Sequence, residues 1–276
     1  MKFGFVTCVQ LGLSCIEKIY EIGGELDLLI TLPDHKAKNK SGRIYLDDIS
    51  QKHNIPLYKV NHINDEDCIN IIKQYNLDWL FIIGWSQIAA SEVLEAPTIG
   101  CIGMHPTLLP LGRGRAAIPW AIIKGLEKTG VSMFLMDQGV DTGKLLGQVE
   151  IPLSATTTAS ELYQKVDHAH IQLIENVFPQ LEQETYELIV QDELKATYWE
   201  GRTPKDGEIN AAMNMEEVDR LVRATTHPYP GAFYIENDKK IVVWEGVLSE
   251  SKMEGQLSFK LIDGYLIPVK YKVEYL

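Results

Sequence analysis

The chain has 276 residues, with 26 lysines and arginines against 38 aspartates and glutamates, a formal net charge of −12 at pH 7. This length predicts one large domain and one smaller domain, since domains usually hold roughly 100–200 residues. The negative charge, without a long basic run, argues against a protein that binds by neutralising many phosphates of a nucleic acid, while a small polar or nucleotide ligand stays compatible with it.

The first half of the chain alternates between apolar runs typical of buried strands and amphipathic stretches typical of helices. The expected elements are a strand at 2–9, a helix at 13–24 with a Gly-Gly stop, a strand at 25–33, a helix at 67–77, a strand at 78–85, a short helix at 89–96 and a strand at 98–105. This order predicts an open α/β sheet, and ligands of such sheets sit beyond the carboxyl ends of the strands.

The second half continues this pattern and then changes. A helix is expected at 117–129, two strands of a hairpin at 130–139 and 144–153, a long helix at 158–183, a helix at 215–227 and strands from 232 onward. We therefore expect an α/β domain over 1–190, a linker over 191–210 and a small β-rich domain over 211–276.

One histidine and one aspartate are the first candidates for chemistry. Pro106 and Pro110 fix the backbone around His105, which predicts a stiff, exposed loop that presents the imidazole. Downstream, M-D-Q-G-V-D-T-G places Asp137 and Asp141 in a tight turn after a buried strand, so Asp141 can meet His105. Such a pair can divide acyl-transfer work between oxyanion stabilisation and proton acceptance, without a metal or a covalent nucleophile.

Several longer stretches agree with this interpretation. They are G-M-H-P-T-L-L-P (103–110), GRGRAAIPWAIIKG (112–125), TGVSMFLMDQGVDTG (129–143), RTPKDG (202–207) and PYPGAF (228–233). With these motifs the chain resembles the formyltetrahydrofolate-dependent formyltransferase family, most of all its nucleotide-sugar N-formyltransferases. The resemblance implies a Rossmann-like domain with a mostly parallel sheet, a small C-terminal β-rich, OB-like domain, and N10-formyltetrahydrofolate as the formyl donor.

The family's active site has the pattern N-x-H … D, in which asparagine and histidine hold the formyl oxygen and aspartate assists proton transfer. By position, the resemblance assigns catalytic roles to His105 and Asp141, whereas Gly103 stands in the place of the asparagine. Loss of one such donor typically costs about 2.7–4 kcal/mol of transition-state stabilisation. A water beside Gly103, or the side chain of Gln10, is a candidate replacement.

The resemblance also implies ligand contacts. The residues expected to bind folate are Gly84, Trp85, Ser86, Ile88, Leu109, Met136 and Val140, and those expected to bind the acceptor substrate are Gln10, Arg115 and Arg202. A guanidinium suits two phosphate oxygens, which favours Arg115 as a diphosphate contact. No metal site is expected, because His168 and His170 are two residues apart on a helix and point in different directions.

The expected reaction is formyl transfer to the primary amine of a nucleotide-linked amino sugar. The alternatives are a formyltetrahydrofolate hydrolase, a methionyl-tRNA formyltransferase, and a catalytically silent binding protein on the same scaffold, which the glycine at 103 makes conceivable. The basic loop at 36–43 is a weak RNA footprint in so acidic a chain. The sugar, the position of its amine, the nucleotide and the oligomeric state stay open, with a homodimer as one arrangement.

The remaining signals concern the environment of the protein. Its four cysteines form no C-x-x-C pair and lie among apolar neighbours, which predicts reduced core thiols rather than disulfides or a zinc site. The apolar N-terminus has no small-residue cleavage signal, and no run reaches the 18 or more apolar residues of a membrane span. A cytoplasmic location without a membrane anchor is therefore expected.

Overall fold

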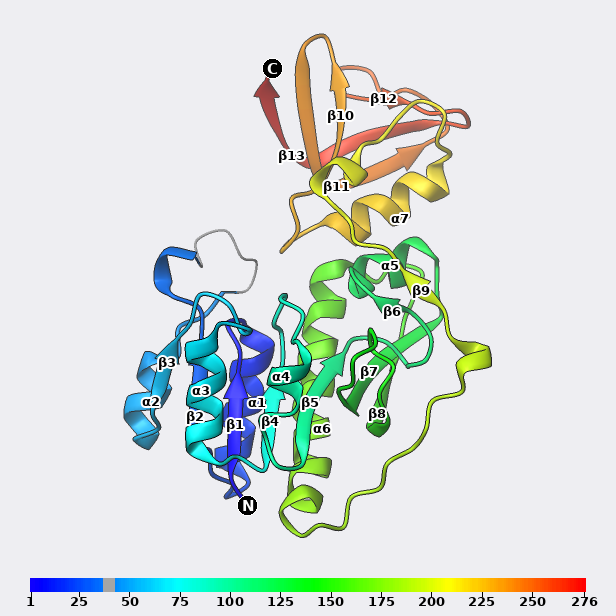
Figure 1. Ribbon diagram of the computed structural model, residues 1–276. Coiled ribbons are helices and arrows are strands. Elements are labelled where there is room, and N and C mark those ends of the chain that lie inside the picture. The colour runs from blue at the N-terminus through cyan, green and yellow to red at the C-terminus, as the bar shows by residue number, and fades with distance from the viewer. Residues whose placement is uncertain (37–42) are drawn as a thin grey trace. The chain divides into compact units, whose positions relative to one another are not determined.

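The computed structural model describes residues 1–36 and 43–276, so most of the basic loop at 36–43 lies outside the described residues. The chain forms two compact units (Figure 1). Unit 1 comprises residues 1–113, 130–151 and 166–198, and unit 2 comprises 114–129, 152–165 and 199–276. The domain boundaries expected near 190 and 211 stay predictions.

Unit 1 is built on a seven-stranded sheet in the order β3-β2-β1-β4-β5-β7-β8. The strands are β1 (Phe3–Val6), β2 (Leu28–Thr31), β3 (Leu57–Lys59), β4 (Trp79–Ile82), β5 (Gly100–His105), β7 (Lys128–Leu135) and β8 (Leu145–Pro152). The pairs β1–β2, β2–β3, β1–β4 and β4–β5 are parallel, whereas β7 runs antiparallel to β5. The predicted mostly parallel sheet is confirmed.

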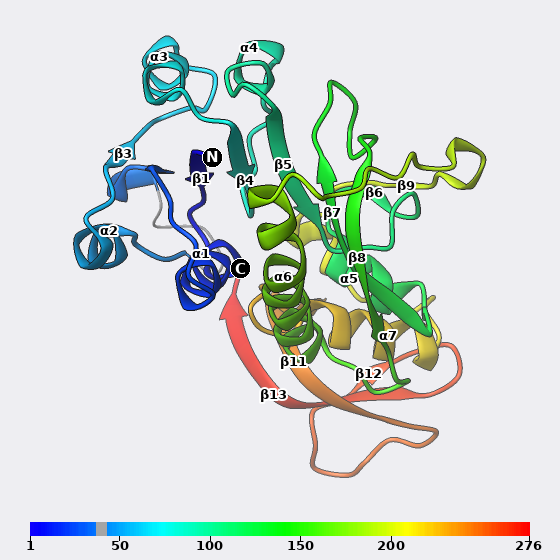
Figure 2. The same cartoon turned by 90° about the horizontal axis from the view of Figure 1, so that it is seen from below.

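Helices cover both faces of this sheet. They are α1 (Gln10–Glu21), α2 (Asp47–His53), α3 (Glu66–Tyr75), α4 (Ser91–Leu94) and α6 (Ala159–Glu182). Figure 2 shows α3 and α4 on one face of the sheet, and α1 and α6 on the other. The predictions missed α2 and β3, because β3 has only three residues, none of them buried, and so short a strand leaves no hydrophobic period to read.

The central strands are apolar on both sides, as two covered faces require. Phe5 and Phe81 stack with ring centroids 5.4 Å apart, and Phe81 also stacks against Phe178 of α6. On the opposite face, Ile82 belongs to a buried cluster that includes Ile72 of α3. This double burial explains why strands β1 and β4 read as continuous apolar runs.

The cysteines are free and buried, as predicted. Burial raises the pKa of the Cys101 thiol to about 12 and also raises the pKa of the Cys15 thiol. These thiols are therefore protonated at neutral pH and lack the thiolate that metal binding and disulfide exchange need. Within the described residues, no helix is long and apolar enough to cross a membrane.

Unit 2 contains α5 (Ala117–Ile123), α7 (Met215–Thr225) and a four-stranded antiparallel sheet. The sheet order is β10-β11-β13-β12, with β10 (Ala232–Glu236), β11 (Lys239–Ser249), β12 (Phe259–Lys260) and β13 (Tyr265–Tyr275). A capping box between Asn214 and Glu217 starts α7. The β-rich C-terminal domain is confirmed, whereas the helix expected at 117–129 ends early, since Gly125 adopts a φ of 61° and β7 begins at Lys128.

Two short strands, β6 (Arg113–Gly114) and β9 (Tyr198–Trp199), form a separate two-stranded sheet. Gly114 has a φ of 109°, and a Cβ there would lie 2.4 Å from the carbonyl oxygen of Trp199. The glycine at the centre of G-R-G-R is therefore needed for the close approach of these strands.

A buried histidine on α6 makes the stability of the fold depend on pH. His170 is 1% exposed, its Nδ1–H donates to the carbonyl of Val166, and burial lowers its pKa to about 4. Because the unfolded state binds this proton near pH 6.5, the free energy of unfolding falls by about 2–3 kcal/mol as the pH drops from 7 to 4.5. In His170→Asn the amide can replace the Nδ1 donor but does not titrate. The free energy of unfolding of this variant, measured by urea unfolding at pH 7 and pH 4.5, should therefore fall less than that of the parent. Parallel pH profiles for parent and variant would contradict this account.

Candidate active site

His105 is the last residue of β5, and its side chain is 9% exposed. The predicted position on an exposed loop is wrong, because β5 keeps its pairing with β7 up to the pair of His105 with Ser132. The stiffness of the following loop has a source beyond its prolines. The Ser132 hydroxyl donates to the carbonyl of Thr107 at 2.7 Å and accepts from the N–H of Leu109 at 3.0 Å.

Hydrogen bonding fixes the orientation of the His105 ring. Its Nε2 lies 2.8 Å from the carbonyl oxygen of Gly112, and since a carbonyl can only accept, Nε2 carries a hydrogen. The other nitrogen, Nδ1, lies 3.5 Å from Oδ2 of Asp141. A hydrogen on Nδ1 would be attracted to the carboxylate of Asp141. The two side chains are therefore arranged to hold one proton between them and to pass it from one to the other.

Two aspartates share the turn after β7 and have different surroundings. Asp137 accepts from the N–H of Gly139 and from the hydroxyl of Thr142, so it closes the turn. Asp141 adopts a left-handed backbone with a φ of 56°, and its side chain is 17% exposed. Because β7 is antiparallel to β5, this turn leaves the sheet at the end opposite to His105 and has to fold back over it. Through this fold-back the carboxylate of Asp141 comes within 3.5 Å of Nδ1 of His105, so the two side chains meet, as expected from the sequence.

The surroundings of Gly103 are crowded. A Cβ at this position would lie 3.1 Å from Cζ of Phe134 and 3.2–3.3 Å from Cγ and Sδ of Met136. These distances are shorter than ordinary carbon contacts, so even an alanine requires its neighbours to move. Gln10 is exposed, and its Nε2 donates to the hydroxyl of Ser14 at 3.2 Å. Neither an open space beside Gly103 nor a free amide of Gln10 is seen.

The residues expected to contact folate divide into exposed and buried groups. Ile88 and Val140 are 80% and 51% exposed, which is unusual for aliphatic side chains, whereas Leu109 is 3% exposed. Trp85 packs against the core, and its indole N–H donates to Gln87 at 3.2 Å. Gly84 needs its glycine, since its φ is 65° and a Cβ would lie 2.1 Å from Cγ2 of Val9.

The remaining expected contacts are Ser86, Met136, Arg115 and Arg202. Ser86 follows β4 in the same loop as Trp85, and Met136 packs against a cluster that contains Leu109. Arg115 is exposed, and among the described residues its guanidinium makes no hydrogen bond or ion pair. Both arginines lie in unit 2, whereas His105 and Asp141 lie in unit 1.

Arg202 is held more firmly than Arg115. Its guanidinium lies 4.8 Å from the ring centroid of Trp120 and donates to the carbonyl of Asp206 at 2.6 Å. Partial burial lowers the pKa of Arg202 from its usual range, although the group stays charged at neutral pH.

The most buried charge near the site belongs to Arg113, whose partners no sequence motif indicates. Arg113 is 0% exposed, and its guanidinium bonds to Gln191, Glu193 and Tyr198. Gln191 lies in the linker expected over 191–210, yet it is buried and also bonds to the turn that carries Asp141. Nothing in the local pattern of 191–198 distinguishes it from a solvated connection, so only the pairing with Arg113 reveals it.

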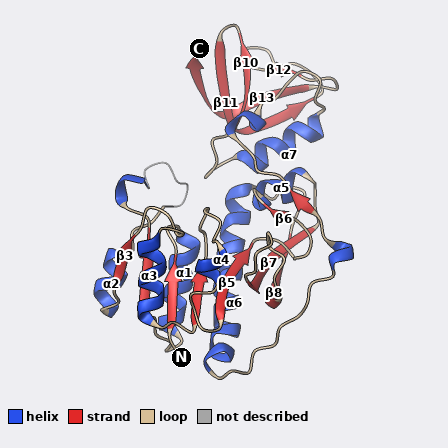
Figure 3. Ribbon diagram, viewed as in Figure 1, coloured by secondary structure: helices blue, strands red, loops and turns tan. Residues whose placement is uncertain are grey.

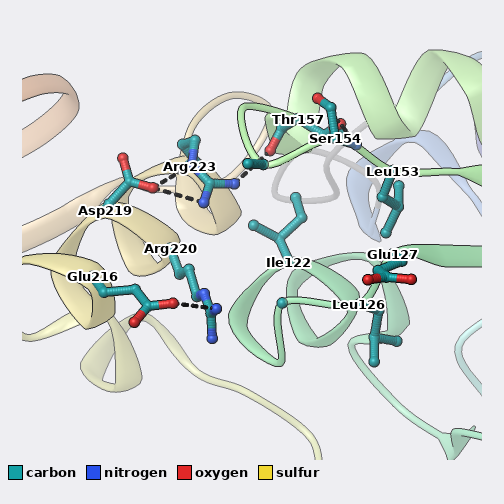
Figure 4. A pocket seen from close by; sticks show the side chains of 12 residues that line it. Ile122, Leu126, Glu127, Leu153, Ser154, Thr157, Glu216, Asp219, Arg220 and Arg223 are labelled. Atoms are coloured by element: carbon teal, nitrogen blue, oxygen red, sulfur yellow. Dashed lines mark hydrogen bonds and ion pairs between the residues drawn. The ribbon is translucent and has the colours of Figure 1, made fainter.

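Unit 2 contains a cavity of about 390 Å³ between α5, α7 and the segment that follows β8 (Figure 4). Two arginines of α7 line it, and both are already bonded. Arg220 pairs with Glu216, and Arg223 pairs with Asp219 at 2.6 Å and donates to the carbonyl of Thr157. Within the described residues, no group of three or more histidine, cysteine, aspartate or glutamate side chains is arranged to hold a metal ion.

Comparisons with known proteins agree with this architecture. The family model "Formyl transferase" matches residues 17–178, and "Formyl transferase, C-terminal domain" matches residues 202–270. A methionyl-tRNA formyltransferase of Clostridioides difficile is 31% identical over 255 residues, which cover 91% of this chain and 82% of that protein.

Two solved structures resemble the whole chain at low identity, which shows the fold. An N-formyltransferase from Helicobacter canadensis, in complex with folinic acid and dTDP-3-aminofucose, has a TM-score of 0.72 at 18% identity, covering 99% of this chain and 100% of that chain. The methionyl-tRNA formyltransferase from Clostridium thermocellum has a TM-score of 0.67 at 17% identity, covering 100% and 99%.

The packing around Gly103 predicts a stability effect. Gly103→Ala should lower the free energy of unfolding by about 1–3 kcal/mol, because the new methyl group overpacks Phe134 and Met136. Adding Met136→Ala should recover part of this loss, and a double-mutant cycle from urea unfolding measures the coupling. Gly201→Ala is a control, since a Cβ there meets its nearest neighbour at 3.5 Å. Equal stabilities of parent and Gly103→Ala would show that the space is open.

Proposed function

Because the chain belongs to the formyl transferase family, we propose that it transfers a formyl group from N10-formyltetrahydrofolate to the primary amine of a nucleotide-linked amino sugar. Membership of the family establishes a formyltransferase, and the donor and acceptor are the proposal. The observation that carries the chemistry is the pair of His105 and Asp141, with Nδ1 and Oδ2 separated by 3.5 Å.

The two side chains have complementary roles in this reaction. Asp141 accepts the proton that the attacking amine loses as it bonds to the formyl carbon, and a proton is returned to N10 of the folate as the bond between N10 and the formyl carbon breaks. His105, with a hydrogen on Nδ1 as well as on Nε2, donates from Nδ1 to the formyl oxygen as negative charge develops there, because Nε2–H is already committed to the carbonyl of Gly112. This division needs no covalent intermediate on the protein.

Gly103 leaves this chain one oxyanion donor short of the family pattern. The neighbouring space is occupied by Phe134 and Met136, so an asparagine amide cannot be added without repacking. His105 therefore carries the stabilisation of the oxygen with fewer partners, and loss of one donor corresponds to a rate about 10²–10³ lower. A slow transferase is the expected consequence.

The residues around the strand ends fit a folate. The segment after β4 lies at the same sheet end as His105, because β4 and β5 are parallel neighbours. Ile88 and Val140 expose aliphatic surface suited to a flat ring system, and Trp85 lies three residues before Ile88 in the chain. When bound, the donor supplies the formyl group, and these residues would exclude water and orient it.

The acceptor is proposed from charge. Arg115 has an exposed guanidinium that makes no bond within the described chain, and a planar fork with five donors matches a diphosphate. The net charge of −12 opposes an extended RNA surface. The Helicobacter canadensis protein, which resembles this chain over its full length, was solved with a nucleotide-linked amino sugar.

Methionyl-tRNA is the second candidate acceptor. It is favoured by one observation, the 31% identity to the methionyl-tRNA formyltransferase of Clostridioides difficile over 91% of this chain. Both acceptors present a primary amine to the same histidine and aspartate, so the catalytic pair does not discriminate between them.

An acceptor assay tests the proposal. The protein is incubated with N10-formyltetrahydrofolate and a panel of nucleotide-linked amino sugars, methionyl-tRNA or buffer alone, while release of tetrahydrofolate is followed. Turnover that requires an amino sugar is expected. Turnover only with the tRNA would replace the sugar by the second candidate, turnover without an amine would indicate a hydrolase, and folate binding without turnover would indicate a silent scaffold.

The role of Asp141 predicts a loss of turnover. Asp141→Asn should lower kcat by about 10²–10⁴, the usual contribution of a positioned general base, because the amide cannot accept the proton. Asparagine tolerates the left-handed backbone at this position, so the fold should survive, as circular dichroism can verify. Asp137→Asn is the matched control, because this carboxylate only closes the turn. Parental turnover in Asp141→Asn would remove Asp141 from the mechanism.

A further inference from the structure

Residues 191–198, here called the clamp segment, connect α6 to β9. Figure 3 shows this connection as loop apart from one short helical turn at Glu193–Lys195. Among the residues that the structure describes, the side chains that bond the buried guanidinium of Arg113 all belong to the clamp segment. Nη2 donates to Oε1 of Gln191 at 2.8 Å, both Nη atoms donate to Glu193 at 2.6–2.8 Å, and Nη1 donates to the Tyr198 hydroxyl at 2.9 Å.

Gln191 extends this network to the turn that carries Asp141. Its Nε2 donates to the carbonyl of Asp141 at 2.9 Å and to the carbonyl of Gly143 at 2.7 Å. Since a guanidinium can only donate and a carbonyl can only accept, these partners leave one orientation for the amide. Gln191 therefore holds the carbonyls on both sides of Thr142 and steadies the left-handed backbone of Asp141.

Thr197 makes the corresponding connection to His105. Its Oγ1 accepts from the N–H of Gly112 at 2.8 Å, and its carbonyl accepts from the N–H of Arg113 at 2.9 Å. Its own N–H donates to the carbonyl of Pro110 at 3.1 Å. Gly112 is the residue whose carbonyl accepts from Nε2 of His105. The position of that acceptor therefore depends on the clamp segment.

We propose that Gln191 and Thr197 are positioning residues for formyl transfer, and that the clamp segment sets the distance and orientation between His105 and Asp141. Arg113 is the common anchor, because its buried charge needs the polar atoms of the segment around it. Only the kinetic test of this inference rests on the proposed function. The two connections can be broken separately, because Gln191 bonds to the carbonyl of Asp141, whereas Thr197 bonds to Gly112, the hydrogen-bond partner of His105.

Gln191→Glu separates positioning from stability. The new carboxylate keeps a partner for Arg113 and repels the carbonyls of Asp141 and Gly143, which lose their donor. A displacement near 1 Å costs about 100-fold in rate, so kcat should fall by about 100-fold while KM for donor and acceptor changes little. Gln180→Ala is the control, because it removes another glutamine-to-carbonyl bond of 2.8 Å, on the surface of α6. Parental kcat in Gln191→Glu, or a rise in KM that accounts for the whole loss, would overturn the proposal.

A second measurement does not depend on turnover. Side-chain ¹⁵N NMR of His105, assigned by its loss in His105→Gln, reports which ring nitrogen carries the hydrogen. In the parent, Nε2 should carry its hydrogen throughout, Thr197→Val should leave part of the population without a hydrogen on Nε2, and Thr197→Ser should restore the parental spectrum. An unchanged spectrum in Thr197→Val would overturn the proposal. If the spectra respond while no acceptor is formylated, the proposed function fails and the positioning network stands.

Discussion

The site depends on one buried charge. A guanidinium without exposed surface is tolerated only when its donors find acceptors, since the cost of removing an ion from water is otherwise several kcal/mol. Arg113 meets this requirement with Gln191, Glu193 and Tyr198, all about eighty residues later in the chain. These bonds tie together the loop after β5, the chain after α6 and the turn after β7. The proposed catalytic residues lie at these segments, His105 at the end of β5 and Asp141 in the turn.

Gly103, which the family resemblance places at the position of an asparagine, is closely packed. The ring of Phe134 and the thioether of Met136 lie close to its backbone. Methionine adapts to irregular spaces, which makes it a suitable filler there. In the proposed reaction the oxyanion would therefore rely on His105, whose ring is held at its other nitrogen by a backbone carbonyl.

The two carboxylates in the turn after β7 differ in their hydrogen-bonding partners, and different roles are therefore proposed for them. Asp137 bonds to groups within its own turn, whereas the left-handed backbone of Asp141 turns its side chain toward the imidazole. Acceptor choice is a separate question, because the proposed pair would serve the amine of a sugar and the amine of methionine alike. The residues proposed to read the acceptor, Arg115 and Arg202, lie in the other unit.

The sequence by itself determined the apolar runs of the parallel strands, the helices between them, the β-rich C-terminal region and the candidate pair of His105 and Asp141. These follow from hydrophobic period and from short motifs, which are local properties of a chain. Only the tertiary structure decided that β7 runs antiparallel to β5, that His105 is buried, that the space at Gly103 is filled and that Gln191 belongs to the site. These features arise from strand direction, packing and hydrogen bonds between residues far apart in the chain, and a polar residue in a loop carries no local sign of the partner that it will meet.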